Sequence, residues 1–239
     1  MIVAILAILL ADTSPAPALP APASPAPAIL RHLEYSFSAN YEGLSEGHYN
    51  GISSGTSGVA SGAHGGSRHG KILVDIDSIA PDGALVISIA EQLWDEPRAY
   101  QTYTCTVYGN TVVLCPSYPH PSDAEWSLLG YLGRQFVDNA PWDSNNHWQR
   151  KDSSRDYDLV EDFTLADASN PQLVRVTETK KTHLHDARMT ERTDDVAIVY
   201  DRTKEIPDSI RDEMKSWNAS GSSNAVFDFK LITDSYAQK

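Results

Sequence analysis

Apolar and polar residues alternate with a period of two over most of the chain. This alternation is typical of strands that bury one face and leave the other in solvent. Tyr35–Tyr41 is the first such run and Phe227–Leu231 the last. Between them, Ile72–Ile76 and Leu85–Ile89 alternate on either side of Pro81-Asp82-Gly83, whose residue types favour a tight turn. The pattern therefore predicts a β-hairpin centred on this turn.

One segment has a helical period instead. Ser122-Asp123-Ala124-Glu125 matches the capping box, in which the serine and the glutamate satisfy free backbone N–H groups at a helix start. Leu128, Leu132 and Phe136 then recur every fourth residue and form an apolar stripe. We expect an amphipathic helix over about residues 122–137, with its stripe buried against a sheet.

The remaining segments have weaker patterns. Gly43–Gly70 holds nine of the 14 glycines, which predicts either a loop or a weak, bulged strand pair. Tyr157–Leu165, Val174–Val176 and Val196–Tyr200 alternate as strands do. Ile206–Trp217 opens with Pro-Asp-Ser, a typical helix start, and is expected to form a short helix or an excursion from the sheet.

The two cysteines lie in a second predicted hairpin, Ala99–Val107 and Thr111–Cys115, turning at Gly109-Asn110. With a three-residue loop, Cys105 and Cys115 face each other across the ladder, so the spacing predicts a disulfide. A redox-active pair usually has Cys-x-x-Cys spacing at a helix N-terminus, and this pair has neither feature. A disulfide also requires an oxidising compartment.

The N-terminus has the pattern of an export signal. Ile2–Leu10 is apolar but much shorter than the roughly 20 residues that cross a bilayer. Six of the 14 prolines follow within Ser14–Ala28, which predicts an extended spacer. We divide the chain into a signal-peptide-like apolar segment (1–13), a Pro/Ala-rich spacer (14–28) and a single antiparallel β domain with one buried helix (29–239). No Lys or Arg precedes the apolar run, so the alternative is a short hydrophobic tail on a cytosolic protein.

The predicted fold is mainly β (α+β): a curved antiparallel sheet or half-barrel of about ten strands wrapped on one amphipathic helix. Short connections favour the antiparallel arrangement. In element order alone, without any shared residue motif, this resembles the half-barrel carriers of the bacterial envelope that hold lipids or lipoproteins. The resemblance implies an apolar space between helix and sheet. Its candidate lining residues are Leu128, Leu132, Phe136, Phe227 and Phe229.

The net charge of the chain limits the kinds of partner that it can bind. The formal charge of −13 argues against a nucleic-acid partner, which requires a basic surface, and against docking on an anionic membrane. No cofactor fingerprint is present, so no cofactor is expected. His183 and His185 share one face of a strand and are candidate metal ligands if a third ligand lies nearby. They lie in the polar segment Thr177–Thr193, whose composition favours an exposed hairpin instead.

The sequence thus leaves three function classes open. The leading expectation is a secreted or periplasmic, non-enzymatic β domain, not membrane-spanning after processing, that binds an envelope partner or a lipid or other apolar small molecule. The alternatives are a metal-dependent or hydrolytic enzyme using His183 and His185, and a purely structural or adhesive surface domain. An open apolar cavity favours a carrier, a packed core a structural module, and a cleft with clustered His and Asp an enzyme.

Overall fold

A computed structural model describes residues 30–43, 48–50, 57–59, 66–95, 101–108, 113–116, 120–132, 146–167, 172–185, 190–218 and 221–236. Within these residues, eleven strands form one antiparallel sheet in the order β7-β6-β5-β4-β1-β13-β12-β11-β10-β9-β8. Its strands are β1 (Arg31–Gly43), β4 (Gly66–Ile79), β5 (Leu85–Leu93), β6 (Tyr103–Val107), β7 (Val113–Leu114), β8 (His147–Ser153), β9 (Tyr157–Asp167), β10 (Leu173–Leu184), β11 (Glu191–Asp201), β12 (Ile206–Asn218) and β13 (Gly221–Tyr236). The strands β2 (His48–Asn50) and β3 (Ser57–Val59) pair separately, inside the glycine-rich segment.

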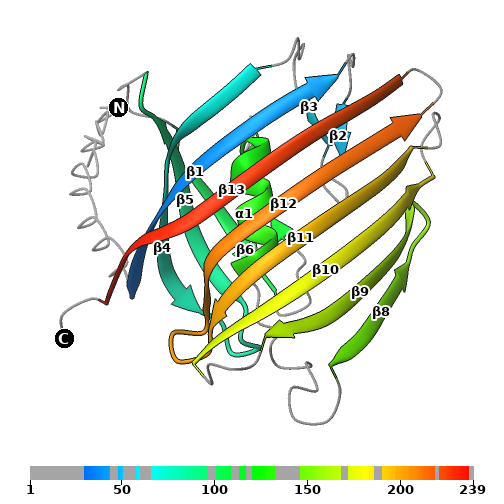
Figure 1. Cartoon of the computed structure of the whole chain (residues 1–239). Coiled ribbons are helices and arrows are strands. Elements are labelled where there is room, and N and C mark those ends of the chain that lie inside the picture. The colour runs from blue at the N-terminus through cyan, green and yellow to red at the C-terminus, as the bar shows by residue number, and fades with distance from the viewer. Residues whose placement is uncertain are drawn as a thin grey trace, which may run out of the picture.

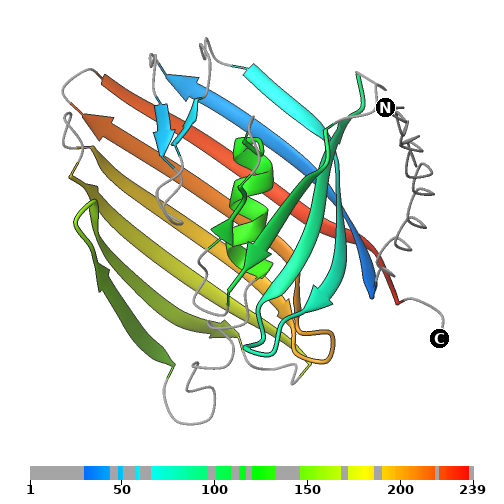
Figure 2. The same cartoon turned by 180° about the vertical axis from the view of Figure 1, so that it is seen from behind.

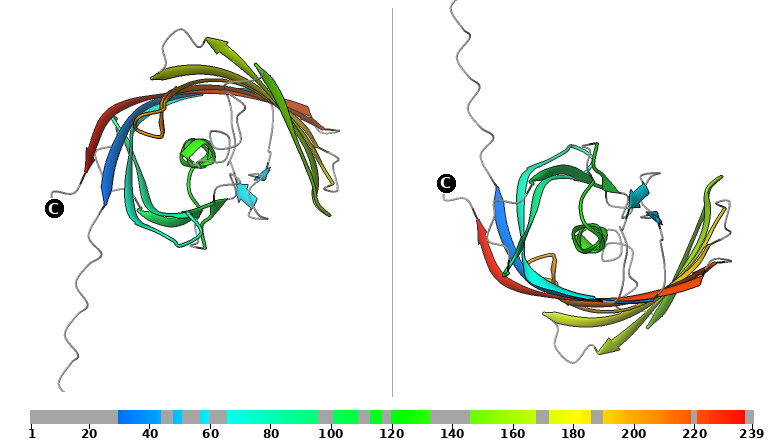
Figure 3. Two further views of the ribbon diagram at one scale, coloured as in Figure 1. Left: turned by 90° about the horizontal axis from the view of Figure 1, so that it is seen from below. Right: turned by 90° about the horizontal axis from the view of Figure 1, so that it is seen from above.

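The large sheet curves around helix α1 (Asp123–Leu132) without closing into a barrel (Figures 1 and 2). Viewed along the helix, β4 to β7 curl round one side of α1, while β8 and β9 lie at the far end of the sheet (Figure 3). The helix contacts β5, β6, β12 and β13 across the concave face. The predicted curved antiparallel sheet on one helix is confirmed, with one strand more than expected in the main sheet.

The β4–β5 hairpin forms at the predicted turn. Gly83 has a φ of 84°, in the left-handed region that glycine adopts without strain. The Ala80 N–H donates to the Ala84 carbonyl at 2.8 Å, and the Asp82 carboxylate accepts from the Ala84 N–H at 3.1 Å. The turn is therefore built by local residues.

The helix begins where the capping box predicts. The Glu125 N–H donates to Ser122 Oγ at 3.2 Å, and the Ser122 N–H donates to Glu125 Oε2 at 2.7 Å. Leu128 and Leu132 are buried in the core. The predicted end of the helix, with Phe136, lies outside the described residues.

Two local predictions were wrong. Ile206–Trp217 is a strand of the main sheet, because β12 pairs with both β11 and β13 along most of its length. Tertiary pairing here outweighs the helix-like start at Pro207. Thr177–Thr193 does form a hairpin across β10 and β11, but it is not fully exposed, because Glu178 and Thr182 on its inward face are 6% and 1% exposed.

The predicted disulfide joins Cys105 and Cys115, whose Cα atoms are 4.3 Å apart. The flanking register pairs Thr106 with Leu114 and Val107 with Val113, so the two cysteines are directly opposed. Both are buried in the core on the concave side of the sheet.

Candidate functional site

An apolar pocket of about 310 Å³ lies at the end of the half-barrel where β1 begins and β13 ends. These two strand ends lie side by side at the lower left of Figure 1. The last residue of α1, Leu132, closes its inner side. The pocket floor consists of side chains that are at most 8% exposed: Ile76, Leu85, Ile87, Leu132 and Ile206. The pocket therefore lies between the helix end and the sheet, with a floor of aliphatic side chains.

The mouth of the pocket is also apolar. Leu30, Ile79 and Tyr236 line it and are 45%, 51% and 61% exposed. They are three of the eight large hydrophobic side chains that are exposed in the described part of the chain. Clustering of such side chains around one opening marks an interaction surface more strongly than scattered exposure does.

The β11–β12 turn forms a well-ordered polar side of the pocket. Asp201 Oδ1 accepts from the Thr203 hydroxyl at 2.7 Å and from the Thr203 and Lys204 N–H groups. Burial alone would raise the pKa of Asp201, but these hydrogen bonds outweigh it and lower the pKa. Glu205 takes a φ of 56° to complete the turn. Its geometry is thus set by local hydrogen bonds.

Arg31 anchors this turn to the sheet. Its guanidinium group donates to the Lys204 carbonyl at 2.8 Å and to both carboxylate oxygens of Asp234, at 2.8 and 3.0 Å. It also lies over the Tyr236 ring at 4.8 Å. The Arg31 side chain is 11% exposed and is held by these partners. The other cation of the pocket wall, Lys204, has 43% of its side chain exposed.

The predicted lining residues divide between pocket and core. Leu132 lines the pocket. Leu128 and Phe227 are 0% and 1% exposed and belong to the packed core, as does Phe229 at 2%. The lining residues missed by the sequence reasoning are of two kinds: Ile76, Leu85 and Ile87 lie in alternating strand runs, and the others lie at strand ends and in the β11–β12 turn.

A second feature is a carboxylate cluster on the inward face of four neighbouring strands. Glu161, Glu178, Asp194 and Asp212 are each at most 6% exposed. Each lies on one of the four strands, Glu161 on β9, Glu178 on β10, Asp194 on β11 and Asp212 on β12. The register makes them diagonal neighbours. Lys180 pairs with both Glu161 and Asp194, and Val196 pairs with both Glu178 and Asp212. The sheet thus carries a row of buried acids beside its apolar core.

Cations partly neutralise the carboxylate cluster, and hydroxyl groups donate hydrogen bonds to it. Arg192 Nε donates to Asp194 at 2.7 Å, and Arg150 forms an ion pair with Glu161. Two hydroxyls of α1, those of Ser127 and Tyr131, donate to Asp212 at 2.9 and 3.3 Å. The last two contacts tie the helix to β12.

The electrostatics of the carboxylate cluster favour protonation. Burial, followed by repulsion from Glu161, raises the pKa of Glu178 to about 8. Burial, followed by repulsion from Asp194, raises the pKa of Asp212 to about 6. A raised pKa of this size favours the protonated form of Glu178 at neutral pH.

A signal for this cluster was present in the sequence. Each acid occupies a position where the alternation calls for an apolar residue, as in Leu159-x-Glu161-x-Phe163 and Ile210-x-Asp212-x-Met214. None of these four acids was among the predicted site residues. Continuing the period of two through them would have placed all four inside.

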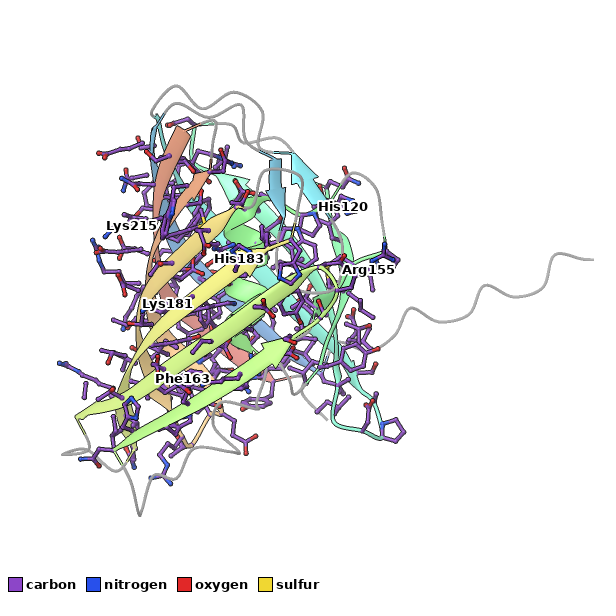
Figure 4. The ribbon with its side chains drawn as sticks, turned by 90° about the vertical axis from the view of Figure 1, so that its right-hand side faces the viewer. His120, Arg155, Phe163, Lys181, His183 and Lys215 are labelled. Carbon is purple, nitrogen blue, oxygen red and sulfur yellow. A yellow bond between two sulfur atoms is a disulfide. The ribbon has the colours of Figure 1, made fainter. Side chains whose placement is uncertain are left out.

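His183 and His185 share the outer face at one end of β10, with ring centroids 5.3 Å apart. Figure 4 shows His183 and the nearby β8–β9 turn that carries Arg155. His183 Nδ1 lies 2.5 Å from Glu191, and His185 lies within hydrogen-bond distance of the Arg155 carbonyl and of Asp158. These contacts, the Arg155 carbonyl foremost, raise the pKa of His185.

No metal-binding set emerges in the described part of the chain. There, no group of three or more His, Cys, Asp or Glu side chains is arranged to hold a metal ion. Asp186, which follows the histidine pair, lies outside the described residues. The pair therefore has two carboxylate partners but no metal geometry that the described residues support.

Comparison with known proteins adds no family. No protein-family model matches the chain, and none of the curated proteins matches it significantly. In the described residues, no helix has both the length and the apolar character needed to cross a bilayer. The function must therefore be argued from the pocket and the surfaces of the domain itself.

Proposed function

We propose that this chain is an exported, non-enzymatic carrier or binding domain that holds one small apolar molecule in the pocket at the end of α1. The observation that carries the proposal is the pocket itself: a buried aliphatic floor below an exposed apolar mouth. Its volume of about 310 Å³ lies at the lower end of the range of roughly 300–1,000 Å³ for ligand sites. The expected ligand is therefore a small apolar molecule or one end of a longer chain.

Two further features support export. The disulfide between Cys105 and Cys115 requires an oxidising compartment to persist. The apolar run at Ile2–Leu10 and the Pro/Ala-rich spacer have the composition of a cleaved leader and a linker. The intact mass of the protein from its native host tests this point. A mature chain starting within residues 14–28 supports export, and a full-length mass contradicts it.

Two other function classes have less support. The carboxylate cluster offers an acid, but its members are at most 6% exposed, so a substrate has no direct access to them. A purely structural module needs no apolar mouth, because exposed Leu, Ile and Tyr side chains around an opening bring no packing energy to the fold.

A fluorescent fatty acid, cis-parinaric acid, is a suitable probe because its emission rises in an apolar site. The test variant is Ile79→Glu, which places a charge at the pocket mouth. The matched control is Ile232→Glu, since Ile79 and Ile232 are both 51% exposed and Ile232 does not line the pocket. Both side chains are exposed to the same extent, so the two changes are expected to affect stability alike and the comparison isolates the pocket.

The proposal predicts saturable binding of one probe per chain to the wild type and to the Ile232→Glu variant. Affinity falls about tenfold or more in Ile79→Glu, because a carboxylate at the mouth must be desolvated when the probe enters. Absence of probe binding to the wild type, or equal binding by both variants, contradicts the proposal.

A further inference from the structure

A groove of about 520 Å³ crosses the outer face of the sheet, the face opposite α1, which Figure 1 views directly. It runs over five neighbouring strands, β4, β1, β13, β12 and β11, with Trp94, the residue after β5, at one end. Four strand spacings of about 4.8 Å give the strand-covered part a length of about 19 Å. We call it the outer groove. It shares no lining residue with the apolar pocket.

Two cross-strand rows form the base of the outer groove. In one row, Ser38 pairs with both His69 and Asp228, and Asp228 pairs with Arg211. In the other row, Ser36 pairs with Lys230, and Lys230 with Ser209. The rows thus combine three small hydroxyl side chains, Ser36, Ser38 and Ser209, with the charged side chains of β12 and β13.

An exposed tryptophan stands at one end of the outer groove. Trp94 is 60% exposed although it follows directly after β5. Its backbone N–H donates to the His69 carbonyl at 3.2 Å, and the His69 ring meets its indole edge-on at 5.2 Å between centroids. These contacts hold an indole beside the groove while leaving most of its surface free for a ligand.

The charged groups of the outer groove are already paired. Arg211 donates to both carboxylate oxygens of Asp228 at 3.0 Å, and Lys230 pairs with Asp208. An ionic ligand must therefore break an existing ion pair to gain a new one. The chain's formal charge of −13 further opposes an anion. Hydroxyl groups of a neutral ligand can instead hydrogen-bond to the outer edges of these pairs and to the serines.

We propose that the outer groove binds a neutral oligosaccharide, with one sugar ring stacked on Trp94 and further units lying over the serine rows. A sugar matches the groove's chemistry because each ring has an apolar C–H face for the indole and hydroxyls for the paired charges. The groove's length fits a chain of several units. This site is independent of the apolar pocket and of its proposed ligand.

Isothermal titration of the full chain with cellohexaose, chitohexaose and maltohexaose tests the proposal, with hexagalacturonate as the anionic counterpart. Trp94→Ala removes the stacking surface. Trp217→Ala is the matched control, because Trp217 is 46% exposed and does not line the outer groove. Ser38→Gln is a second variant that fills the centre of the groove and leaves Trp94 intact.

At least one neutral hexasaccharide is expected to bind, with hexagalacturonate about tenfold weaker or absent. Trp94→Ala and Ser38→Gln are each expected to weaken binding about tenfold, equivalent to about 1.4 kcal/mol, while Trp217→Ala changes it less than about twofold. The proposal is overturned if no neutral probe binds at about 5 mM, where even a millimolar Kd is visible, or if Trp94→Ala binds like the wild type. Tighter binding of the anionic probe overturns it as well.

Discussion

Truncating the two helix leucines one at a time tests whether the space beside Leu132 is a real void. Leu128 and Leu132 lie one turn apart on α1 and are 0% and 4% exposed. They differ in surroundings, because Leu132 borders the pocket and Leu128 does not. The same substitution to alanine at both positions therefore isolates the effect of the void.

The expected costs follow from two terms. Each Leu→Ala change removes three carbon groups, which at about 0.8 kcal/mol each gives a transfer loss of about 2.4 kcal/mol. At Leu128 a new cavity adds to this loss, for a total of about 4 kcal/mol. At Leu132 the space joins a pocket that already exists, so the cavity term is small and the total stays near 2–3 kcal/mol.

Urea denaturation followed by tryptophan fluorescence measures both values, with equal m-values as the check that both variants unfold from comparable states. Leu132→Ala is expected to be the milder change by about 1–2 kcal/mol. Equal losses, or a larger loss at Leu132, would show that Leu132 is packed as tightly as Leu128 and would refute the reasoning.

Three further predictions concern stability. Replacing both Cys105 and Cys115 by serine is expected to cost about 3 kcal/mol of stability, measured by urea denaturation, because the disulfide closes a short loop. Recovery of two free thiols in non-reducing peptide maps of the protein from its native host would contradict the bond. Because folding raises the pKa of Glu178 to about 8, the free energy of unfolding is expected to fall as pH rises from about 4.5 to about 8, by up to about 1.4 kcal/mol per pH unit. Glu178→Gln should flatten this pH profile. Identical profiles for the variant and the wild type would exclude Glu178 as the cause. Gly70→Ala is expected to destabilise by about 1–3 kcal/mol, because the added Cβ would overlap a backbone carbonyl of β5, and an unchanged Tm would contradict that packing.

Local signals explain what the sequence predicted correctly. The Pro81-Asp82-Gly83 turn, the Ser122 capping box and the opposed cysteines each depend on residues close together in the chain. The prediction for β12 was wrong because Pro207-Asp208-Ser209 resembles a helix start, whereas pairing with β11 and β13 decides the structure of this segment. The alternation Ile210-x-Asp212-x-Met214 within the segment is the sign of a strand, but the charged residue in its middle obscured it.

The candidate site was predicted only in part, for a related reason. Its walls come from six separate stretches of chain, around Leu30, Ile76, Leu85, Leu132, Ile206 and Tyr236. The helix stripe pointed to Leu132 because that residue repeats with helical period. The other five lie on or beside different strands, so their common pocket depends on how the sheet curves.

Native mass spectrometry of the purified protein tests the central claim most directly. The account predicts a complex of one apolar molecule per chain, either carried through purification or formed on incubation with a saturated fatty acid. Ile87→Phe, which enlarges a side chain on the pocket floor, should reduce that complex. Only the bare mass of the folded chain under both conditions would contradict the account.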